Sequence, residues 1–165
     1  MSLFSWLPPL LEVDWNDYAA TIERAYSIFE QDFGQEETRP HFLGRVLRLK
    51  RHPLYLGKSA TFWHFVTQGS DEANREPVRE RLERIAWPRA LIVNAHDGDR
   101  VCRWAAVRKG ETRWHLTLPD FSYLVVLADR GSFLLPWTAY PVEHQHQRRK
   151  LEAAWASASR GRPKS

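Results

Sequence analysis

The chain is poor in cysteine and in long apolar runs, and both shortages limit what the protein can be. Its 165 residues include one cysteine, Cys102, so no disulfide can form within the chain. A chain of this length folds without a metal or a disulfide, and a lone thiol fits a reducing compartment. The apolar stretch 1–13 has no Lys or Arg, unlike a signal peptide, and no run reaches the ~18 residues of a membrane span. We therefore expect a cytoplasmic protein in which Cys102 is a small buried residue.

Motifs for metals and cofactors are missing as well. The seven histidines include no HExxH motif, and the single cysteine rules out paired zinc-binding cysteines. Neither GxxxxGK[ST] nor GxGxxG occurs, although Gly57-Lys58-Ser59 is similar to the end of a phosphate-binding loop. The sequence predicts no metal site and no cofactor, and it argues against a nucleotide triphosphatase.

Charge and aromatic residues are what the sequence has in quantity. Residues 1–38 contain one basic and eight acidic residues, whereas residues 39–165 contain 23 basic and 12 acidic residues. The segment Arg39–Lys58 alone holds six Lys or Arg and no acid. Eight Trp, eight Phe and five Tyr supply core area and surfaces on which bases can stack. This asymmetry suggests a body that faces a polyanion, and a solvated basic surface is the alternative.

Apolar periodicity predicts three helices. The first covers 14–34, with Asp14 as N-cap and apolar residues at steps of three and four. The second is expected over 76–86, where Trp87-Pro88 would end it, and the third over 142–156. The residues after 156 are small and basic and are expected to form a disordered tail, 157–165.

Alternating and β-branched segments predict the strands. Leu43–Lys50 and Thr61–Thr67 read as two strands between the first two helices, and four more are expected as an antiparallel meander, with Pro136 at an edge or a bulge. The four are Ala90–Asn94, Arg100–Val107, Thr112–Leu118 and Tyr123–Ala128, and a further run, Ser132–Tyr140, completes the meander. The fold class is therefore α+β, one domain over 1–156, with an antiparallel multi-stranded sheet and N-terminal, middle and C-terminal helices packed on one side of it.

Histidine and basic residues on a sheet suit RNA cleavage without a metal. In that reaction the 2′-hydroxyl attacks the phosphate, so the protein supplies a general acid, a general base and cations. His64 is the first candidate for proton transfer, and a core histidine between Phe62 and Val66 is the alternative. Lys58, Arg84, Thr138 and Tyr140 are the other catalytic candidates, although Arg84 would also suit a surface ion pair and Tyr140 the core. The candidates for nucleic-acid binding are Arg48, Lys50, Arg51 and His115.

Four segments together carry a resemblance to a known family. They are Gly57-Lys58-Ser59-Ala60-Thr61-Phe62-Trp63-His64, Glu83-Arg84-Ile85-Ala86-Trp87-Pro88, Tyr123-Leu124-Val125-Val126-Leu127 and Trp137-Thr138-Ala139-Tyr140-Pro141. In this order they resemble phage-associated members of the barnase–EndoU–colicin–RelE nuclease superfamily. The resemblance covers roughly 42–151, and the corresponding core would span 42–156.

The resemblance implies a metal-independent endoribonuclease, toxin-like or active in phage–host conflict. It matches His64 and Lys58 to the early catalytic position, Thr138 or Tyr140 to the late one, and Arg84 to the arginine of the middle helix. RNA would be the partner, together with an antitoxin or inhibitor protein. Two alternatives stay open from the residues: a nucleic-acid-binding module without catalysis, and an interaction domain whose charge only keeps it in solution.

Overall fold

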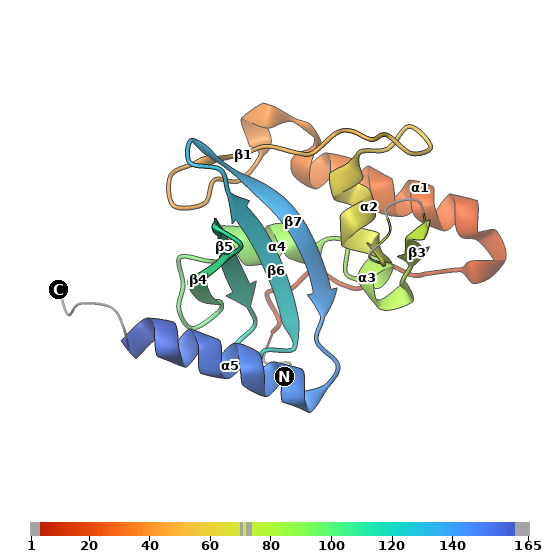
Figure 1. The fold of residues 1–165 in the computed structure, drawn as a ribbon. Helices are drawn as coiled ribbons and strands as arrows, with labels where there is room; N and C mark the ends of the chain where they lie inside the picture. The colour runs from red at the N-terminus through yellow and green to blue at the C-terminus, as the bar shows by residue number, and fades with distance from the viewer. Residues whose placement is uncertain (1–3, 70, 72–73, 161–165) are drawn as a thin grey trace.

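A five-stranded sheet forms the centre of the fold (Figure 1). The structure is a computed structural model that describes residues 4–69, 71 and 74–160. The strand order is β1-β7-β6-β5-β4. The last four strands form an antiparallel meander: β4 (Cys102–Arg108), β5 (Glu111–Thr117), β6 (Tyr123–Asp129) and β7 (Phe133–Pro141). The short β1 (Val46–Leu47) pairs in parallel with β7. The predicted α+β class with a mostly antiparallel sheet is confirmed.

Local sequence explains the geometry of the meander. Lys109 and Gly110 both have positive φ, 51° and 77°, which is the backbone that a tight hairpin between β4 and β5 requires. The register between β6 and β7 shifts between Val126 and Leu127 of β6. Val126 pairs with Thr138, and Leu127 pairs with Pro136. Trp137 is the extra residue of this bulge, and the prediction of an edge or bulge at Pro136 is confirmed.

The predicted N-terminal helix is also confirmed. It consists of η1 (Trp15–Asp17), α1 (Tyr18–Phe29) and a π-helical end, η2 (Glu30–Gly34), followed by the short η3 (Glu36–Thr38). The Asp14 carboxylate accepts a hydrogen bond from the Asn16 N–H at 2.9 Å, as expected of an N-cap. Ile22, Phe29 and Phe33 are buried on one side, so the helical period of the sequence corresponds to its buried face.

The strand predicted over Thr61–Thr67 is wrong, because these residues form α2 (Ala60–Val66). The Ser59 hydroxyl caps this helix by accepting from the Phe62 N–H at 3.4 Å. All seven helix residues are buried, so the aromatic and β-branched side chains meet neighbours all round the helix. A fully buried short helix and a buried strand have the same apolar composition, which explains the error.

Three further segments differ from the sequence predictions. Only Val46–Leu47 of the expected strand 43–50 pairs in the sheet. The expected helix 76–86 divides into β3 (Glu76–Pro77), which pairs with β2 (Thr67–Gln68), and the short α3 (Arg79–Glu83). The strand expected over 90–94 belongs to α4 (Trp87–Val93), because Pro88 stands in the first turn, where its missing N–H costs nothing, and begins the helix rather than ending one.

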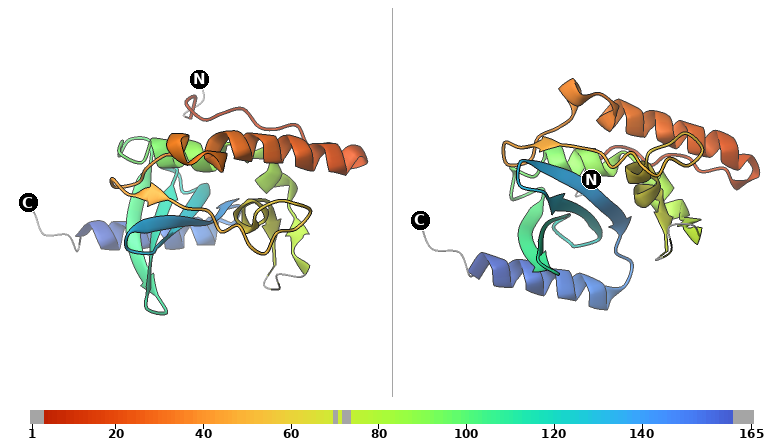
Figure 2. Two further views of the ribbon diagram at one scale, coloured as in Figure 1. Left: turned by 90° about the horizontal axis from the view of Figure 1, so that it is seen from above. Right: turned by 45° about the horizontal axis from the view of Figure 1, so that its top comes forward.

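Helices cover both faces of the sheet, not one face as expected (Figure 2). The main core lies between one face and α1 to α4, with Phe29, Phe62 and Leu91 against Val125 and Leu127. On the other face, α5 (Gln145–Arg160) packs Leu151 and Trp155 against a smaller cluster with Trp104 and the buried Cys102. α5 extends to 160, so residues 157–160 of the predicted tail are helical, and 161–165 lie outside the described residues.

Candidate nucleic-acid interface

Three aromatic residues of β7 each carry a cation over the ring. The Arg48 guanidinium lies 4.8 Å from the Phe133 ring centroid, and that of Arg81 lies 5.0 Å from Tyr140. Trp137 meets two cations, Lys50 at 5.9 Å and Arg113 at 5.1 Å. We call this set the β7 stripe: Arg48, Lys50, Arg81, Arg113, Phe133, Trp137 and Tyr140. Every member keeps part of its surface in solvent, so the stripe offers rings and charges together.

The backbone of β7 and its neighbours brings the stripe together. At one end, a cavity of about 480 Å³ is lined by Arg48, Lys50, Arg130, Phe133 and Trp137, among others. The parallel pairing of β1 with β7 holds the segment with Arg48 there, since the Arg48 N–H donates to the Leu134 carbonyl at 2.9 Å. At the base of the same segment, the Arg45 guanidinium forms two bonds to Asp129, 2.7 and 2.9 Å long.

One carboxylate moderates the positive charge near Trp137. Glu111 Oε2 accepts from Arg113 at 3.2 Å, and Arg130 lies 3.1 Å from Oε1. Arg48 and Lys50 also approach the same cavity. The cations around Phe133 and Trp137 therefore outnumber the acid, which favours an anionic ligand.

Tyr140 and Arg81 also line a second feature, which we call the polar cleft. Its volume is about 370 Å³, and the residues around it include Gln68, Glu80, Glu143, His144 and Gln147. The Arg81 guanidinium is fixed there by the Thr67 carbonyl at 2.6 Å. Burial, and secondarily the charge of Arg75, lowers the pKa of Arg81 from its usual value. The polar cleft thus joins a fixed cation to groups that can accept or donate protons.

His64 lies beside the β7 stripe rather than on a strand within it. Its ring centroid is 5.6 Å from that of Trp137, and the residue is only 8% exposed. Its carbonyl accepts a hydrogen bond of 3.4 Å from Arg81. The structure therefore brings His64 near Trp137 and Arg81, but mostly beneath the surface.

Two other catalytic candidates point elsewhere. Lys58 is 7% exposed, and its ammonium group lies 2.5 Å from Glu23 on α1 and 5.3 Å from the Tyr26 ring. The Arg84 guanidinium stacks over Trp87 at 5.0 Å and donates to the Glu80 carbonyl at 3.0 Å. The surface ion-pair alternative for Arg84 agrees with this placement, since Glu83 lies 3.9 Å away. The structure does not bring Lys58 and Arg84 into the β7 stripe.

The remaining predicted residues divide between the sheet and the α1 side. Thr138 is half-buried on β7 and pairs with Val126 beside the bulge. Arg51 lines a cavity next to α1 with Tyr26 and Glu30. His115 stacks on Trp104 with a centroid distance of 5.1 Å, and burial lowers its pKa, which favours the neutral ring.

The candidates predicted from the sequence did not include Arg81, Arg113, Phe133 and Trp137. Arg81 comes from α3 and Arg113 from β5, so only tertiary structure places them on β7. A signal for the rings was present, because Phe133, Leu135 and Trp137 alternate along an expected strand. Their shared face therefore favoured the same prediction of a binding surface as Thr138 and Tyr140 did.

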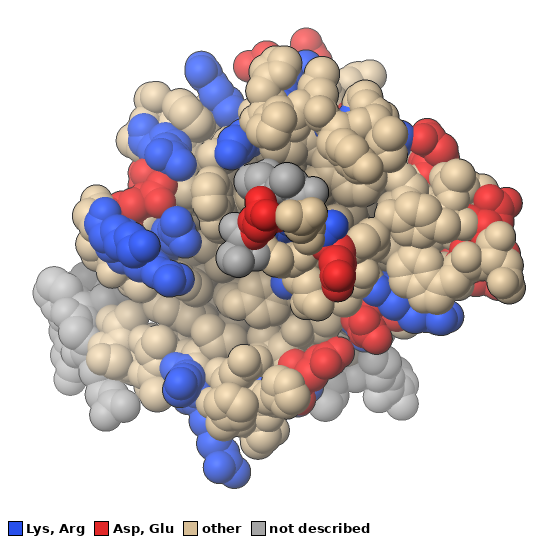
Figure 3. Space-filling view, turned by 45° about the vertical axis from the view of Figure 1, so that its right-hand side comes forward, with Lys and Arg blue, Asp and Glu red and all other residues tan. Residues whose placement is uncertain are grey.

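Positive and negative side chains gather on different parts of the surface. In Figure 3, Lys and Arg are most numerous on the left of the face shown, and Asp and Glu on its right and centre.

Within residues 4–69, 71 and 74–160, no group of three or more His, Cys, Asp or Glu is placed to hold a metal ion. None of the helices described there is both long and apolar enough to cross a bilayer. Comparisons with protein families, curated proteins and solved structures found no match for this chain, so the nuclease resemblance stays a prediction.

Proposed function

We propose that the protein binds single-stranded RNA along the β7 stripe. The observation that carries the proposal is the repetition along one strand: Phe133, Trp137 and Tyr140 each have a cation over the ring. Unpaired bases stack on aromatic rings, and their phosphates attract Arg and Lys. A duplex buries the faces of its bases, so it gains only the charge contacts.

The length of the stripe sets the scale of the ligand. Phe133 and Tyr140 are seven residues apart on β7, which at a rise of about 3.3 Å per residue corresponds to roughly 23 Å. That length suits on the order of four nucleotides, at the small end of known single-strand sites. We expect the bases to lie near the rings and the phosphates near the cations around them.

Replacing Lys50 with Ala tests the charge contribution. We expect the dissociation constant of a short fluorescent oligouridine to rise roughly fivefold, because one phosphate contact is lost. Between roughly 50 and 200 mM salt, the slope of log affinity against log salt should become shallower by about 0.7. Fluorescence anisotropy measures both quantities.

Arg149→Ala is the matched control, because Arg149 is exposed on α5 and its loss changes net charge equally. Binding to oligouridine, oligodeoxythymidine and duplex RNA should be compared in parallel. Equal affinity for duplex and single strand, or the same slope in both variants, would contradict the proposal.

Cleavage of the bound RNA is the second candidate function, and the polar cleft favours it. His144, Glu80 and Glu143 line this cleft together with Arg81 and Tyr140. A base there would take the proton of a ribose 2′-hydroxyl as the O2′–P bond forms. The P–O5′ bond then breaks, an acid protonates O5′, and the products are a 2′,3′-cyclic phosphate and a 5′-hydroxyl end.

We expect the protein to cleave oligouridine in the presence of a chelator, and His144→Asn to slow cleavage by at least about 100-fold. His146→Asn is the matched control, because His146 stacks on His144 but does not line the cleft. His64→Asn tests the first sequence candidate in the same assay. Binding without any cleavage by the parent protein would reject this second function and leave the first intact.

A further inference from the structure

An aromatic pocket lies apart from the β7 stripe, between α1, α2 and the short hairpin β2–β3. Its volume is about 520 Å³. Its walls are mostly apolar and include Tyr18, Leu54, Tyr55 and Trp63, with Thr67 and Arg75 as the polar members. Pockets of this size and lining are typical sites for small ligands with one or two fixed polar groups.

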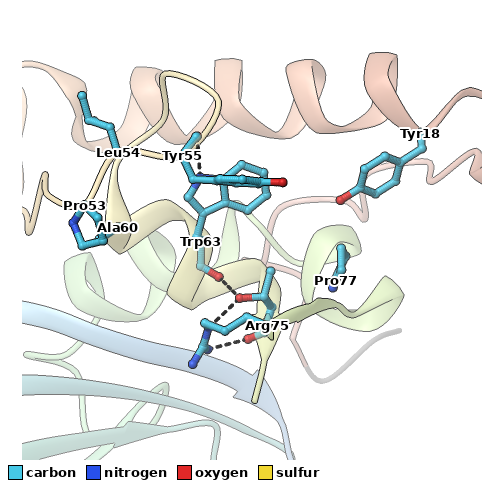
Figure 4. Close-up of a pocket in the computed structure, with 9 residues that line it drawn as sticks. Tyr18, Pro53, Leu54, Tyr55, Ala60, Trp63, Arg75 and Pro77 are labelled. Atoms are coloured by element: carbon cyan, nitrogen blue, oxygen red, sulfur yellow. Dashed lines mark hydrogen bonds between the residues drawn. The ribbon is translucent and has the colours of Figure 1, made fainter. Parts of the chain in front are cut away.

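The rings of the aromatic pocket are held in place (Figure 4). The Trp63 indole N–H donates to the Tyr55 carbonyl at 2.9 Å, and the two rings meet edge to face at 5.3 Å. The turn that carries Tyr55 closes through two backbone bonds to Lys58 and places Leu56 and Gly57 at positive φ. Figure 4 shows the Tyr18 hydroxyl pointing toward the space beside these rings.

Side chains around the opening remain uncovered. Tyr55 is 62% exposed and Leu54 54% exposed. Tyr18 stacks on the exposed Trp15 at 5.6 Å, which extends the apolar surface along α1. A planar ligand in the pocket would cover part of this area, and ring-to-ring contact with Tyr55 and Trp63 would orient it.

The polar corner of the pocket is positively charged. Arg75 donates to the Thr67 hydroxyl at 2.8 Å, to the Thr67 carbonyl at 2.9 Å and to the Gly69 carbonyl at 2.6 Å. Arg81 donates to the same Thr67 carbonyl at 2.6 Å, so the two guanidinium nitrogens are at most 5.5 Å apart, the sum of 2.6 and 2.9 Å. Two cations so close repel each other, and an anion beside them relieves that repulsion.

We propose that this pocket binds a planar aromatic small molecule that carries one anionic group, with the rings against Tyr55 and Trp63 and the anion beside Arg75. Arg81 of the β7 stripe also bonds to Thr67 of this pocket, but the aromatic rings of the two sites are separate. Trp63 and His64 lie side by side in the chain and contact different neighbours. Trp63 meets Tyr55, whereas His64 meets Trp137 of the stripe. Specificity would come from the combination, since the walls alone would accept any apolar molecule.

A matched pair of fluorescent probes separates the contribution of the anionic group to binding from that of the rings. Anilinonaphthalene sulfonate carries the anion, and N-phenylnaphthylamine has the same rings without it. We expect the sulfonate to bind at least about tenfold more tightly, since a charge-assisted hydrogen bond is worth that much. Arg75→Gln should remove this preference and leave the affinity for the neutral probe unchanged. Tyr55→Ala should weaken both probes.

Three controls make the outcome decisive. Trp137→Ala should not change sulfonate binding, and a loss there would place the probe on the β7 stripe and overturn the proposal. Arg149→Gln should change nothing, because the residue is exposed on α5. If circular dichroism shows that Arg75→Gln is unfolded, Arg75→Lys keeps the charge and should keep the preference. Equal affinity of both probes for the parent protein, or a folded Arg75→Lys without preference, would refute the assignment.

Discussion

Replacing Trp137 with Ala is expected to weaken the binding of single-stranded RNA by at least about tenfold, because one stacked base contributes about 1–3 kcal/mol. The ring also organises its surroundings: Lys50, Arg113 and His64 all lie within 6 Å of its centroid. Removing it therefore takes away a stacking surface and leaves Lys50 and Arg113 without the ring beside them. Anisotropy titration with a short oligouridine at fixed salt measures the loss.

Control variants distinguish stacking from damage to the fold. Trp137→Phe keeps a ring and should stay within about threefold of the parent affinity, since any aromatic face stacks a base. Trp15→Ala removes an exposed tryptophan from η1 and should have no effect on RNA binding. Glu111→Gln should act in the opposite direction, because it removes the carboxylate that pairs with Arg113 and Arg130. Unchanged affinity in Trp137→Ala would refute the proposed interface.

The second large effect is a pH-dependent change in the stability of the protein, caused by Asp32 on η2. Burial raises the pKa of this carboxyl group from 3.8 to about 6, although the charge of Arg89 opposes the shift. Its Oδ2 atom is buried and has no hydrogen-bond partner within the described part of the chain. The folded state therefore disfavours the ionised carboxylate more than the unfolded state does.

The sign of the pH dependence follows from the raised pKa. Below about pH 4 the group is protonated in both states and costs nothing. As the pH rises through 4 to 6, the unfolded chain ionises first, so Asp32 progressively lowers the free energy of unfolding. Above about pH 6 the penalty is complete. Raising the pKa from 3.8 to about 6 corresponds to roughly 3 kcal/mol, and partial solvation of the group reduces this to about 1–2 kcal/mol.

Asp32→Asn should therefore stabilise the protein by about 1–2 kcal/mol at pH 7.5, which for a chain of this size raises Tm by roughly 2–8 °C. The gain should shrink toward zero near pH 4. Thermal unfolding followed by circular dichroism at several pH values measures it. Asp99→Asn, at an exposed position in a turn, is the control and should show no such gain. A stability difference that does not depend on pH would contradict the explanation.

Fold elements with a clear period were predictable, and buried short ones were not. The helix at 14–34 and the strands from Cys102 to Pro141 follow from their own side-chain patterns and the turns between them, although β6 is buried on both faces. Residues 61–67 gave the wrong element because every side chain of TFWHFVT is buried and these residue types show no period that distinguishes a helix from a strand. The cap at Ser59 was the available sign of a helix.

For the candidate site, the sequence predicted the types of residue involved, and the structure decided which of them lie together. The sequence predicted a basic segment, many aromatic residues, and Arg48, Lys50 and Tyr140 as site residues. Their grouping was not, because the cations of the β7 stripe come from segments that meet only when the sheet forms. Lys58 and Arg84 show the converse, since each has a partner elsewhere.

The sequence by itself determined the α+β class, the meander and the uneven charge, because these depend on local periodicity and composition. Tertiary structure alone decided which cation lies over which ring. Such contacts join residues far apart in the chain, as Arg48 and Phe133 are, and no local pattern records a distance across the fold.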